Sequence, residues 1–299
     1  FSTLQTCFLA AKGLLGQVKG KDGAGVDYVV QAIRARELAV EKYNTLSPDF
    51  QRVLEGYCAG FNQFAKTHPK EVQHKNLAPI SPLDMATFGV LQLFVFTGGD
   101  AALQSIVAGE VPLAEMPAAH GSNAYAFNSL KTKDGQVYLN INSHQPWEGI
   151  VAWYEAHLCS EEGLNIVGGL FPGAPCILHG CNEYLGWAHT VNNPDKSDVY
   201  QLEMNPENEL QYRFDNQWLT LEERSIRLKV KIKGVPISVR KKAWWSVYGP
   251  TFKNKKGMFS IRSSGLFDIR ALEEWYRMNK ARNFSEFYQA LKMEAIPGF

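Results

Sequence analysis

Apolar residues recur at helical spacing through the first hundred residues of the chain. The segment Val26–Tyr43 has this period, and Ser47, followed by a proline, is predicted to cap a second helix. Ser81 gives the same signal for a third helix that continues to about Phe96. The glycines of Thr97–Asp100 are predicted to end it. The first third of the chain is therefore predicted to be helical.

After residue 121 the pattern changes to short alternating segments that are typical of β-strands. The predicted strands are Asn123–Phe127, Val137–Ile141, Trp153–Leu158, Leu164–Val167, Cys176–His179, Leu185–Val191, Ile226–Ile232 and Val235–Lys241. Another hairpin is predicted at Tyr212–Trp218, and Gly234 is predicted to join the last two strands. Their lysines fall on alternate positions, so we expect these to face solvent and protect the sheet edge.

The chain becomes helical again at Ile269–Met278 and Phe284–Met293. Helices followed by many strands and then helices predict an α+β fold, in which helices cover the sheets. The stretch 106–121 is rich in Ala, Pro, Glu and Gly, which is the composition of a linker. We therefore divide the chain into a helical part, residues 1–105, a linker or spacer peptide, residues 106–121, and a strand-rich part, residues 122–299.

Composition and charge narrow the class of protein. With 299 residues, 45% apolar content and a net charge of +1, the chain can bury a sizeable core and shows no basic block beyond its predicted strands. We expect no nucleic-acid partner, and no apolar run is long enough to span a membrane. The five cysteines cannot all pair internally. The spacing of Cys176 and Cys181 fits either a bridged turn or two buried thiols.

Ser122 is the candidate nucleophile, because it stands between Gly121 and Asn123 at the start of a predicted strand. A serine hydroxyl needs an adjacent base to attack a carbonyl at neutral pH. If the bond before Ser122 is cut, its own α-amine, with an ordinary pKa of about 7.7–8.0, supplies that base. The small Gly121 leaves room for Ser122 to attack the preceding carbonyl. Taken alone, this tripeptide fits an ordinary loop-to-strand turn equally well.

Motifs in a set order follow Ser122 and decide between these interpretations. They are His144, Pro172-Gly173-Ala174-Pro175, Gly180-Cys181-Asn182, Trp187-Ala188-His189-Thr190, Asp195 with Asp198, Tyr248-Gly249-Pro250 and Trp275-Tyr276-Arg277-Met278-Asn279. The series resembles the penicillin acylase and acyl-homoserine-lactone acylase family of self-cleaving serine hydrolases. The resemblance covers about residues 50–67 and 121–298, and its N-terminal part is the weaker.

The resemblance implies the four-layer αββα sandwich of N-terminal-nucleophile hydrolases, with a helical N-terminal part. It implies self-cleavage between Gly121 and Ser122, which yields a first (α) and a second (β) chain. Ser122 then matches the nucleophile, and His144 matches a position that is histidine in homoserine-lactone acylases and glutamine in penicillin G acylases. Val191 matches the residue whose backbone N–H forms half of an oxyanion hole. The other half, an asparagine side chain, is expected beyond Phe299.

An apolar pocket should hold the acyl chain that such enzymes remove. Aromatic residues on the third predicted helix and in the strand-rich part are candidates for its lining, although each fits the hydrophobic core as well. They are Phe94, Phe96, Trp147 and Phe171.

A calcium site is a further expectation from the resemblance, because some penicillin acylases bind calcium at the matching aspartates. The matching residues are Asp195 and Asp198, with Ser197 at a position that donates its carbonyl. Carboxylate and carbonyl oxygens suit this cation. A solvated acidic loop is the alternative, and the expected chemistry requires no cofactor.

The resemblance implies an amide hydrolase that removes an acyl chain from a small acylated amine. An N-acyl-homoserine lactone is favoured because position 144 is histidine rather than glutamine. The alternatives are a penicillin or lipopeptide acylase with the same machinery, and a non-catalytic, unprocessed acylase-like domain. The family also implies a periplasmic or secreted location, although no signal peptide is visible in this chain.

Overall fold

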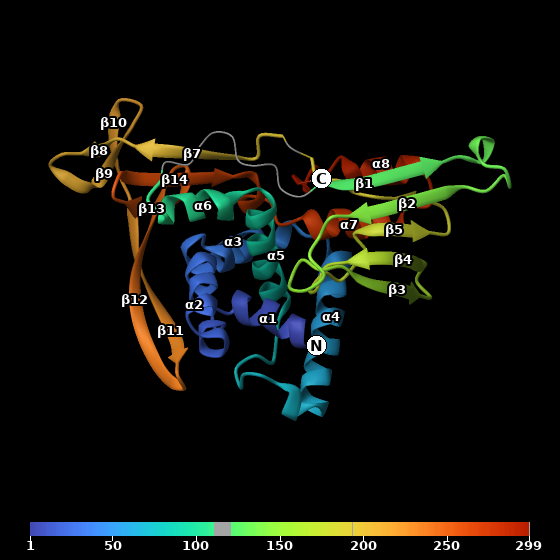
Figure 1. Cartoon of the computed structure of the whole chain (residues 1–299), viewed down its shortest axis with the longest axis horizontal. Helices are drawn as coiled ribbons and strands as arrows, with labels where there is room; N and C mark the ends of the chain where they lie inside the picture. The colour runs from blue at the N-terminus through green and yellow to red at the C-terminus, as the bar shows by residue number, and fades with distance from the viewer. Residues whose placement is uncertain (111–120, 193, 299) are drawn as a thin grey trace.

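The computed structural model describes residues 1–110, 121–192 and 194–298, which form helices and sheets in the mixture that the sequence predicts (Figure 1). The helices are α1 (Ser2–Ala11), α2 (Gly16–Ala32), α3 (Ala35–Lys42), α4 (Pro48–Thr67), α5 (Pro82–Phe96), α6 (Gly99–Val107), α7 (Ala271–Lys280) and α8 (Phe284–Leu291). The strands are β1 (Ser122–Phe127), β2 (Tyr138–Ser143), β3 (Tyr154–Ser160), β4 (Leu164–Leu170), β5 (His179–Asn182), β6 (Gly186–Trp187), β7 (Ser197–Leu202), β8 (Met204–Asn205), β9 (Asn208–Phe214), β10 (Gln217–Thr220), β11 (Glu222–Ile232), β12 (Val235–Ser246), β13 (Gly249–Asn254) and β14 (Gly257–Ser263).

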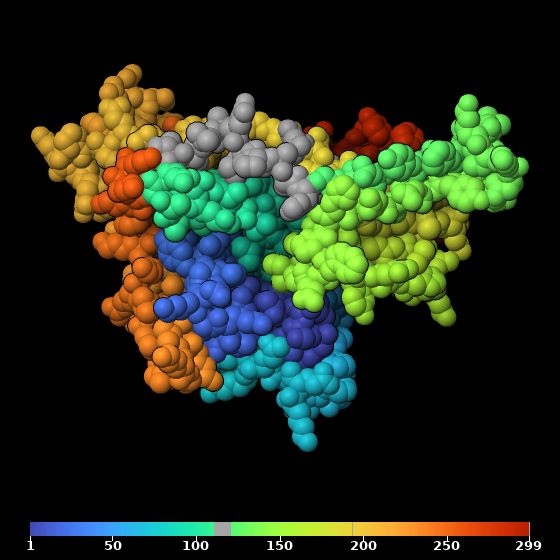
Figure 2. Space-filling view, viewed as in Figure 1, coloured from blue at the N-terminus to red at the C-terminus, as the bar shows by residue number. Residues whose placement is uncertain are grey.

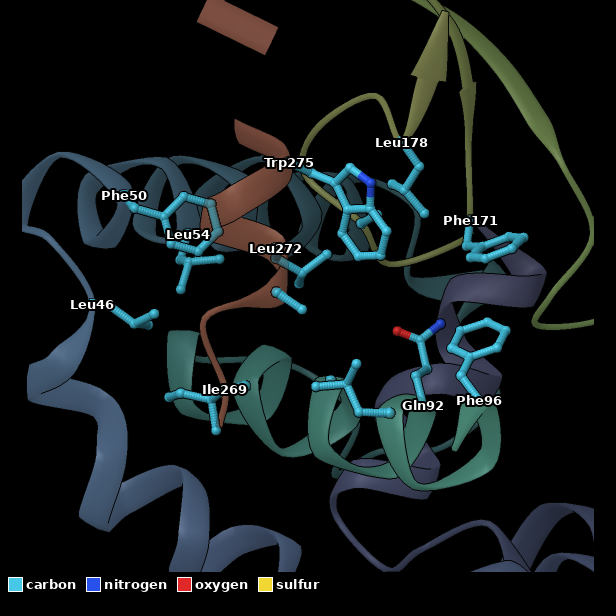
Figure 3. Close-up of a pocket in the computed structure, with 15 residues that line it drawn as sticks. Leu46, Phe50, Leu54, Gln92, Phe96, Phe171, Leu178, Ile269, Leu272 and Trp275 are labelled. Atoms are coloured by element: carbon cyan, nitrogen blue, oxygen red, sulfur yellow. The ribbon is translucent and has the colours of Figure 1, made fainter. Parts of the chain in front are cut away.

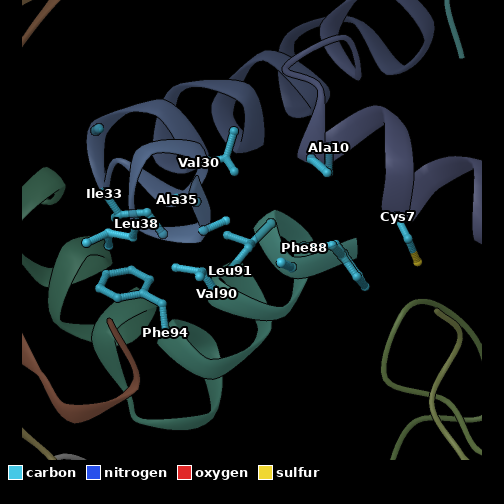
Figure 4. Close-up of a cluster of buried hydrophobic side chains, with 14 of the residues drawn as sticks. Cys7, Ala10, Val30, Ile33, Ala35, Leu38, Phe88, Val90, Leu91 and Phe94 are labelled. Carbon is cyan, nitrogen blue, oxygen red and sulfur yellow. The ribbon is translucent and has the colours of Figure 1, made fainter. Parts of the chain in front are cut away.

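Two predicted helix starts are confirmed by their caps. The Ser47 side chain accepts a hydrogen bond from the Phe50 amide at 3.3 Å, which begins α4. Ser81 and Asp84 form a capping box at the start of α5. The apolar α5 then runs through the middle of the helical part, where Val90 and Leu91 pack against residues 30–38 (Figure 4). This helix therefore organises the main hydrophobic core.

The strands form four sheets in the described residues. Their orders are β1-β2, β10-β9-β8, β11-β12-β13-β14-β7 and β3-β4-β5-β6. The long β11–β12 hairpin lies beside α2 (Figure 1), and β11 confirms the predicted alternation, with Leu228 and Val230 buried and Lys229 exposed. In β12 the prediction fails, because residues 235–242 are exposed at apolar and polar positions alike. Lys233 and Gly234 form its turn, both with positive φ. The four-layer αββα arrangement of the sheets stays a prediction.

Three local predictions are corrected by the structure. Thr97 ends α5 as predicted, but another helix, α6, follows at once. Gly99 lets the α6 backbone approach Phe94, because a Cβ at this position would lie 2.2 Å from the phenylalanine ring. Helix α1 and strands β13 and β14 were missed. β5 begins at His179 rather than at Cys176, and β6 ends at Trp187 rather than Val191. The predicted linker overlaps the end of α6, and its residues 111–120 lie outside the described residues.

The cysteines and the hydrophobic helices settle two further points. All five thiols are free; Cys176 is buried and Cys181 exposed, so neither of the two predicted arrangements holds. Within the described ranges, no single helix is long and apolar enough to cross a membrane. Only α5 and α6 together reach that length and composition, and a 71° bend separates them.

Candidate active site

The β1–β2 hairpin brings the predicted self-cleavage residues together. Antiparallel pairing places Ser122 opposite Ser143, so His144 lies one residue beyond the partner of the serine. Gly121 is close to the imidazole ring of His144, because a Cβ on this glycine would lie 3.9 Å from Nδ1 of that ring. His144 Nε2 lies 3.4 Å from Asn142 Nδ2. The structure thus places Gly121, Ser122 and His144 side by side, while their roles stay predictions.

The hairpin that carries Ser122 extends from the body of the molecule (Figure 2), and its strand residues are exposed or, at Ser122 and alternate positions of β2, half-buried. Tyr125 is 55% exposed, and Phe127 and Tyr138 are similarly accessible. Trp147, predicted to line the acyl pocket, is 99% exposed and contributes to no described cavity wall. Its place after β2 puts it on the surface, so the structure assigns it no pocket role.

An apolar cavity lies between α5, α7 and α4 (Figure 3). Its free volume is about 30 Å³, which is room for water but not for an acyl chain unless the wall moves. Its lining consists of Leu46, Phe50, Leu54, Ala86, Gly89, Gln92, Leu93, Phe96, Phe171, Ala174, Leu178, Ile269, Ala271, Leu272 and Trp275. Two of the predicted pocket residues, Phe96 and Phe171, are therefore in its wall, and their rings stack 5.4 Å apart.

Phe94 is the exception on α5, because it does not line this cavity. It is fully buried in the main core, where it lies against Gly99. Residues two positions apart in an α-helix lie about 200° apart around its axis, so Phe94 and Phe96 point in opposite directions. The spacing of the two aromatic residues already places them on opposite faces of α5, but the sequence does not show which of them faces the cavity.

Asparagine side chains hold the cavity wall in place. Asn279 on α7 accepts from the Ile177 amide at 2.8 Å and donates to the Ile177 carbonyl at 2.6 Å. Asn182 donates to the carbonyls of Asn279 and Ala281, while its oxygen accepts from the amides of the Tyr184–Leu185 turn. These bonds fix the backbone beside Leu178. Both asparagines belong to the motifs that carry the family resemblance, but the sequence alone predicts no role for either. Their amide side chains were the available signal.

Two buried histidines lie behind this wall. The Trp275 indole N–H donates to His189 Nε2 at 2.8 Å, and the His179 ring stacks on Trp153 at 3.9 Å. Burial lowers the pKa of each histidine to about 4, so both rings are neutral near pH 7. His189 therefore packs and accepts a hydrogen bond at the cavity wall.

Val191 lies after β6, two residues beyond His189, and is partly buried. The adjacent Asn192 amide donates to the Gly298 carbonyl at 3.2 Å, which ties this segment to residues near the end of the described chain. The described lining of the cavity includes neither Val191 nor Ser122. The oxyanion role of the Val191 N–H stays a prediction.

The expected calcium ligands are only partly grouped. Asp195 is exposed, whereas Ser197 and Asp198 begin β7 rather than lying in a loop. The Ser197 hydroxyl donates to the Thr97 carbonyl at 2.8 Å. Over residues 1–110, 121–192 and 194–298, no three His, Cys, Asp or Glu side chains converge as a metal cage requires. The expected site uses a carbonyl oxygen beside two aspartates, so calcium at these residues stays a prediction.

The architecture and the strand-borne serine define a class of protein, and comparison with known families identifies it. The family model described as penicillin amidase matches residues 1–299, so the chain belongs to the penicillin amidase family. The acyl-homoserine lactone acylase PvdQ of Pseudomonas fluorescens (strain Pf0-1) is 26% identical over an alignment 279 positions long, which covers 82% of this chain and 36% of that protein. PvdQ of Pseudomonas syringae pv. syringae is 26% identical over an alignment 308 positions long, gaps included, which covers 91% of this chain and 39% of the relative.

Two other relatives have different names. Aculeacin-A acylase of Actinoplanes utahensis is 25% identical over an alignment 269 positions long, which covers 79% of this chain and 34% of that protein. A solved structure of thermostable penicillin G acylase from Alcaligenes faecalis has 30% identity and a TM-score of 0.41, covering 46% of this chain and 25% of its own. The chain therefore spans between a third and two fifths of the length of these curated relatives.

Proposed function

We propose that the complete protein is an amide hydrolase that removes an acyl chain from a small N-acylated amine. The observation that carries the proposal is the placement of Ser122. It begins β1, follows a small glycine and lies beside His144, in a chain that the family model matches from end to end. Cleavage before Ser122 would give this serine a free α-amine, and would divide the protein into two chains.

In the proposed reaction, Ser122 Oγ attacks the amide carbonyl while its own amine accepts the hydroxyl proton, directly or through a water. The Val191 N–H and an asparagine from the longer protein stabilise the oxyanion. The protonated amine then gives its proton to the leaving amine, and water releases the acyl group from Ser122 as a carboxylic acid. His144 holds the serine in position.

The apolar cavity beside Phe96 and Phe171 is proposed to widen from its free volume of about 30 Å³ and receive the acyl chain, because its lining is hydrophobic. We further infer that the complete protein forms the four-layer αββα sandwich. Further elements would then cover the exposed β1–β2 hairpin, since an isolated two-stranded sheet is marginally stable. Calcium at Asp195 and Asp198 would be structural, and a periplasmic or secreted location is part of the same proposal.

The proposed substrate is an N-acyl-homoserine lactone, supported by the names of the PvdQ relatives and by His144. An acylated peptide is the second candidate, supported by the aculeacin-A acylase relative. A non-catalytic, unprocessed domain is less favoured, because Ser122 and His144 are both present at the start and end of the hairpin.

Ser122→Ala in the complete protein tests both parts of the proposal. We expect a single uncut chain by intact mass and a loss of amide hydrolysis of about 10⁴-fold or more, since nucleophile and base are both removed. Ser143→Ala is the matched control, because Ser143 faces Ser122 across the hairpin and should leave cleavage and turnover intact. Mass spectrometry should detect free homoserine lactone; a ring-opened product with its amide intact would contradict the assignment.

A further inference from the structure

Gln92 differs from every other side chain in the cavity wall. It lies on α5, one turn before Phe96. The other lining side chains are apolar except Trp275, whose indole N–H donates to His189. Figure 3 shows the Gln92 amide rising from α5 toward Trp275, beside the Phe96 ring. A polar amide is therefore directed into an otherwise hydrophobic cavity.

The Gln92 Nε2 is buried and has no hydrogen-bond partner among the residues that the structure describes. Buried polar groups in folded proteins are almost always paired, since an unpaired donor loses its bonds to water without replacement. The described cavity lining offers no side-chain oxygen that this donor could reach by a rotamer change. The cavity thus presents a donor that an occupant can satisfy.

Two nearby nitrogens do not compete for that occupant. Trp153 Nε1 and His179 Nδ1 are also buried without described partners, but neither residue lines the cavity. Trp153 stacks on Phe171 at 4.1 Å and on His179 at 3.9 Å, behind the wall. Gln92 is therefore the polar group that an acyl chain in this cavity would meet.

We propose that Gln92 is a specificity-determining residue that selects acyl chains bearing an oxo or hydroxyl group over plain hydrocarbon chains. The inference rests on the proposed function, because it assigns the cavity to the acyl chain. An oxygen on the chain accepts from Nε2, whereas a plain chain leaves the donor unpaired in an apolar surrounding. Sites that hydrogen-bond a substrate discriminate strongly against an analogue that lacks the polar group.

Gln92→Met in the complete, processed protein tests the inference, because methionine keeps the length of the side chain and removes the amide. The substrates are N-acyl-homoserine lactones of equal chain length, one plain and the others with one oxo group at successive carbons. The wild-type kcat/KM should favour at least one oxo substrate by roughly tenfold, and Gln92→Met should abolish that preference. Leu93→Met, an apolar change at the next lining residue, should leave the preference unchanged.

Product binding separates this inference from the proposed function. Calorimetry measures how tightly plain and hydroxylated fatty acids of equal length bind to the wild type and to Gln92→Met. We expect the variant to bind the hydroxylated acid roughly tenfold more weakly than the wild type does, and to bind the plain acid no more weakly. If the wild type hydrolyses no acyl amide but shows this binding difference, the proposed function fails and the role of Gln92 stands. An unchanged preference in both assays, as when a bound water satisfies the amide, would overturn the inference.

Discussion

The β1–β2 hairpin and the apolar cavity carry the two halves of the proposed site, and they are built in opposite ways. The hairpin holds Ser122 and His144 mainly by backbone pairing, and none of its strand side chains is fully buried. The cavity is formed by buried side chains from α4, α5, the β4–β5 connection and α7, and Phe171, Leu178 and Trp275 are each at most 3% exposed. One half depends on register and the other on packing.

This difference teaches where each half is vulnerable. Antiparallel register determines which residue lies opposite Ser122 without the help of a core, but a two-stranded sheet has little stability of its own. The cavity wall is locked by the bonds from Asn279 to Ile177, which join segments 102 residues apart. Changes in the hairpin should therefore affect chemistry more than folding, and changes in the cavity wall should affect both.

After Ser122, the largest effect is expected at Val191, where only the backbone N–H is proposed to act. Val191→Pro removes that donor and should lower kcat of the complete protein by about 10²–10³-fold. Val191→Ala keeps the N–H and should stay within a few fold of the wild type. Equal losses in the two variants, with unchanged thermal unfolding, would show that the side chain and not the N–H matters.

A smaller effect, on stability, should separate the two regions directly. Phe171→Ala in the cavity wall should lower the free energy of unfolding by about 3 kcal/mol, because it removes a buried ring that stacks on Trp153. Tyr125→Ala in the exposed hairpin should cost about 0.5 kcal/mol or less in this 299-residue chain. Urea denaturation measures both. A larger cost for Tyr125→Ala in the complete protein would show that further elements cover the hairpin.

The hairpin and the capped helices were predictable because their signals are local. Ser47 and Ser81 with their prolines indicate helix starts, and the alternation in Ile226–Ile232 indicates a half-buried strand. The neighbourhood of Ser122 and His144 follows from the length of the hairpin. In each case the residues that determine the structure lie within one element or one turn of each other.

The cavity was less predictable because its wall depends on contacts between distant segments. Residues 176–178 have the composition of a strand, but the Asn279 side chain pairs with both backbone groups of Ile177, so β5 begins only at His179. Phe94 and Phe96 are equally apolar, and only the packing of α5 decides that one enters the core and the other the cavity. Gln92 was missed for the same reason, since its surroundings come from other elements.

The last expected effect depends on pH and concerns Glu274 on α7, which connects the cavity side of the molecule to the segment near Val191. Its carboxylate is buried and accepts from the Ala295 amide at 2.7 Å, and the same segment ends at Gly298, whose carbonyl pairs with the Asn192 amide. Burial raises the pKa of Glu274 to about 7, a shift that the Ala295 bond and Arg270 oppose and that Asp268 and Glu294 support. The native carboxyl therefore keeps its proton where an unfolded glutamate loses it.

A carboxyl whose pKa is raised by folding stabilises the protein at low pH, and this stabilisation is lost as pH rises from about 4.5 to about 7. Glu274→Gln cannot ionise and should be more stable than the wild type by about 3 kcal/mol at pH 8, with the difference vanishing below about pH 4. Buried Asp27, with a pKa raised to about 6, gives both proteins a residual slope of the same sign. Urea denaturation at several pH values checks this, with exposed Glu161→Gln as control. A parallel pH profile for wild type and Glu274→Gln would mean that Glu274 does not titrate in this range.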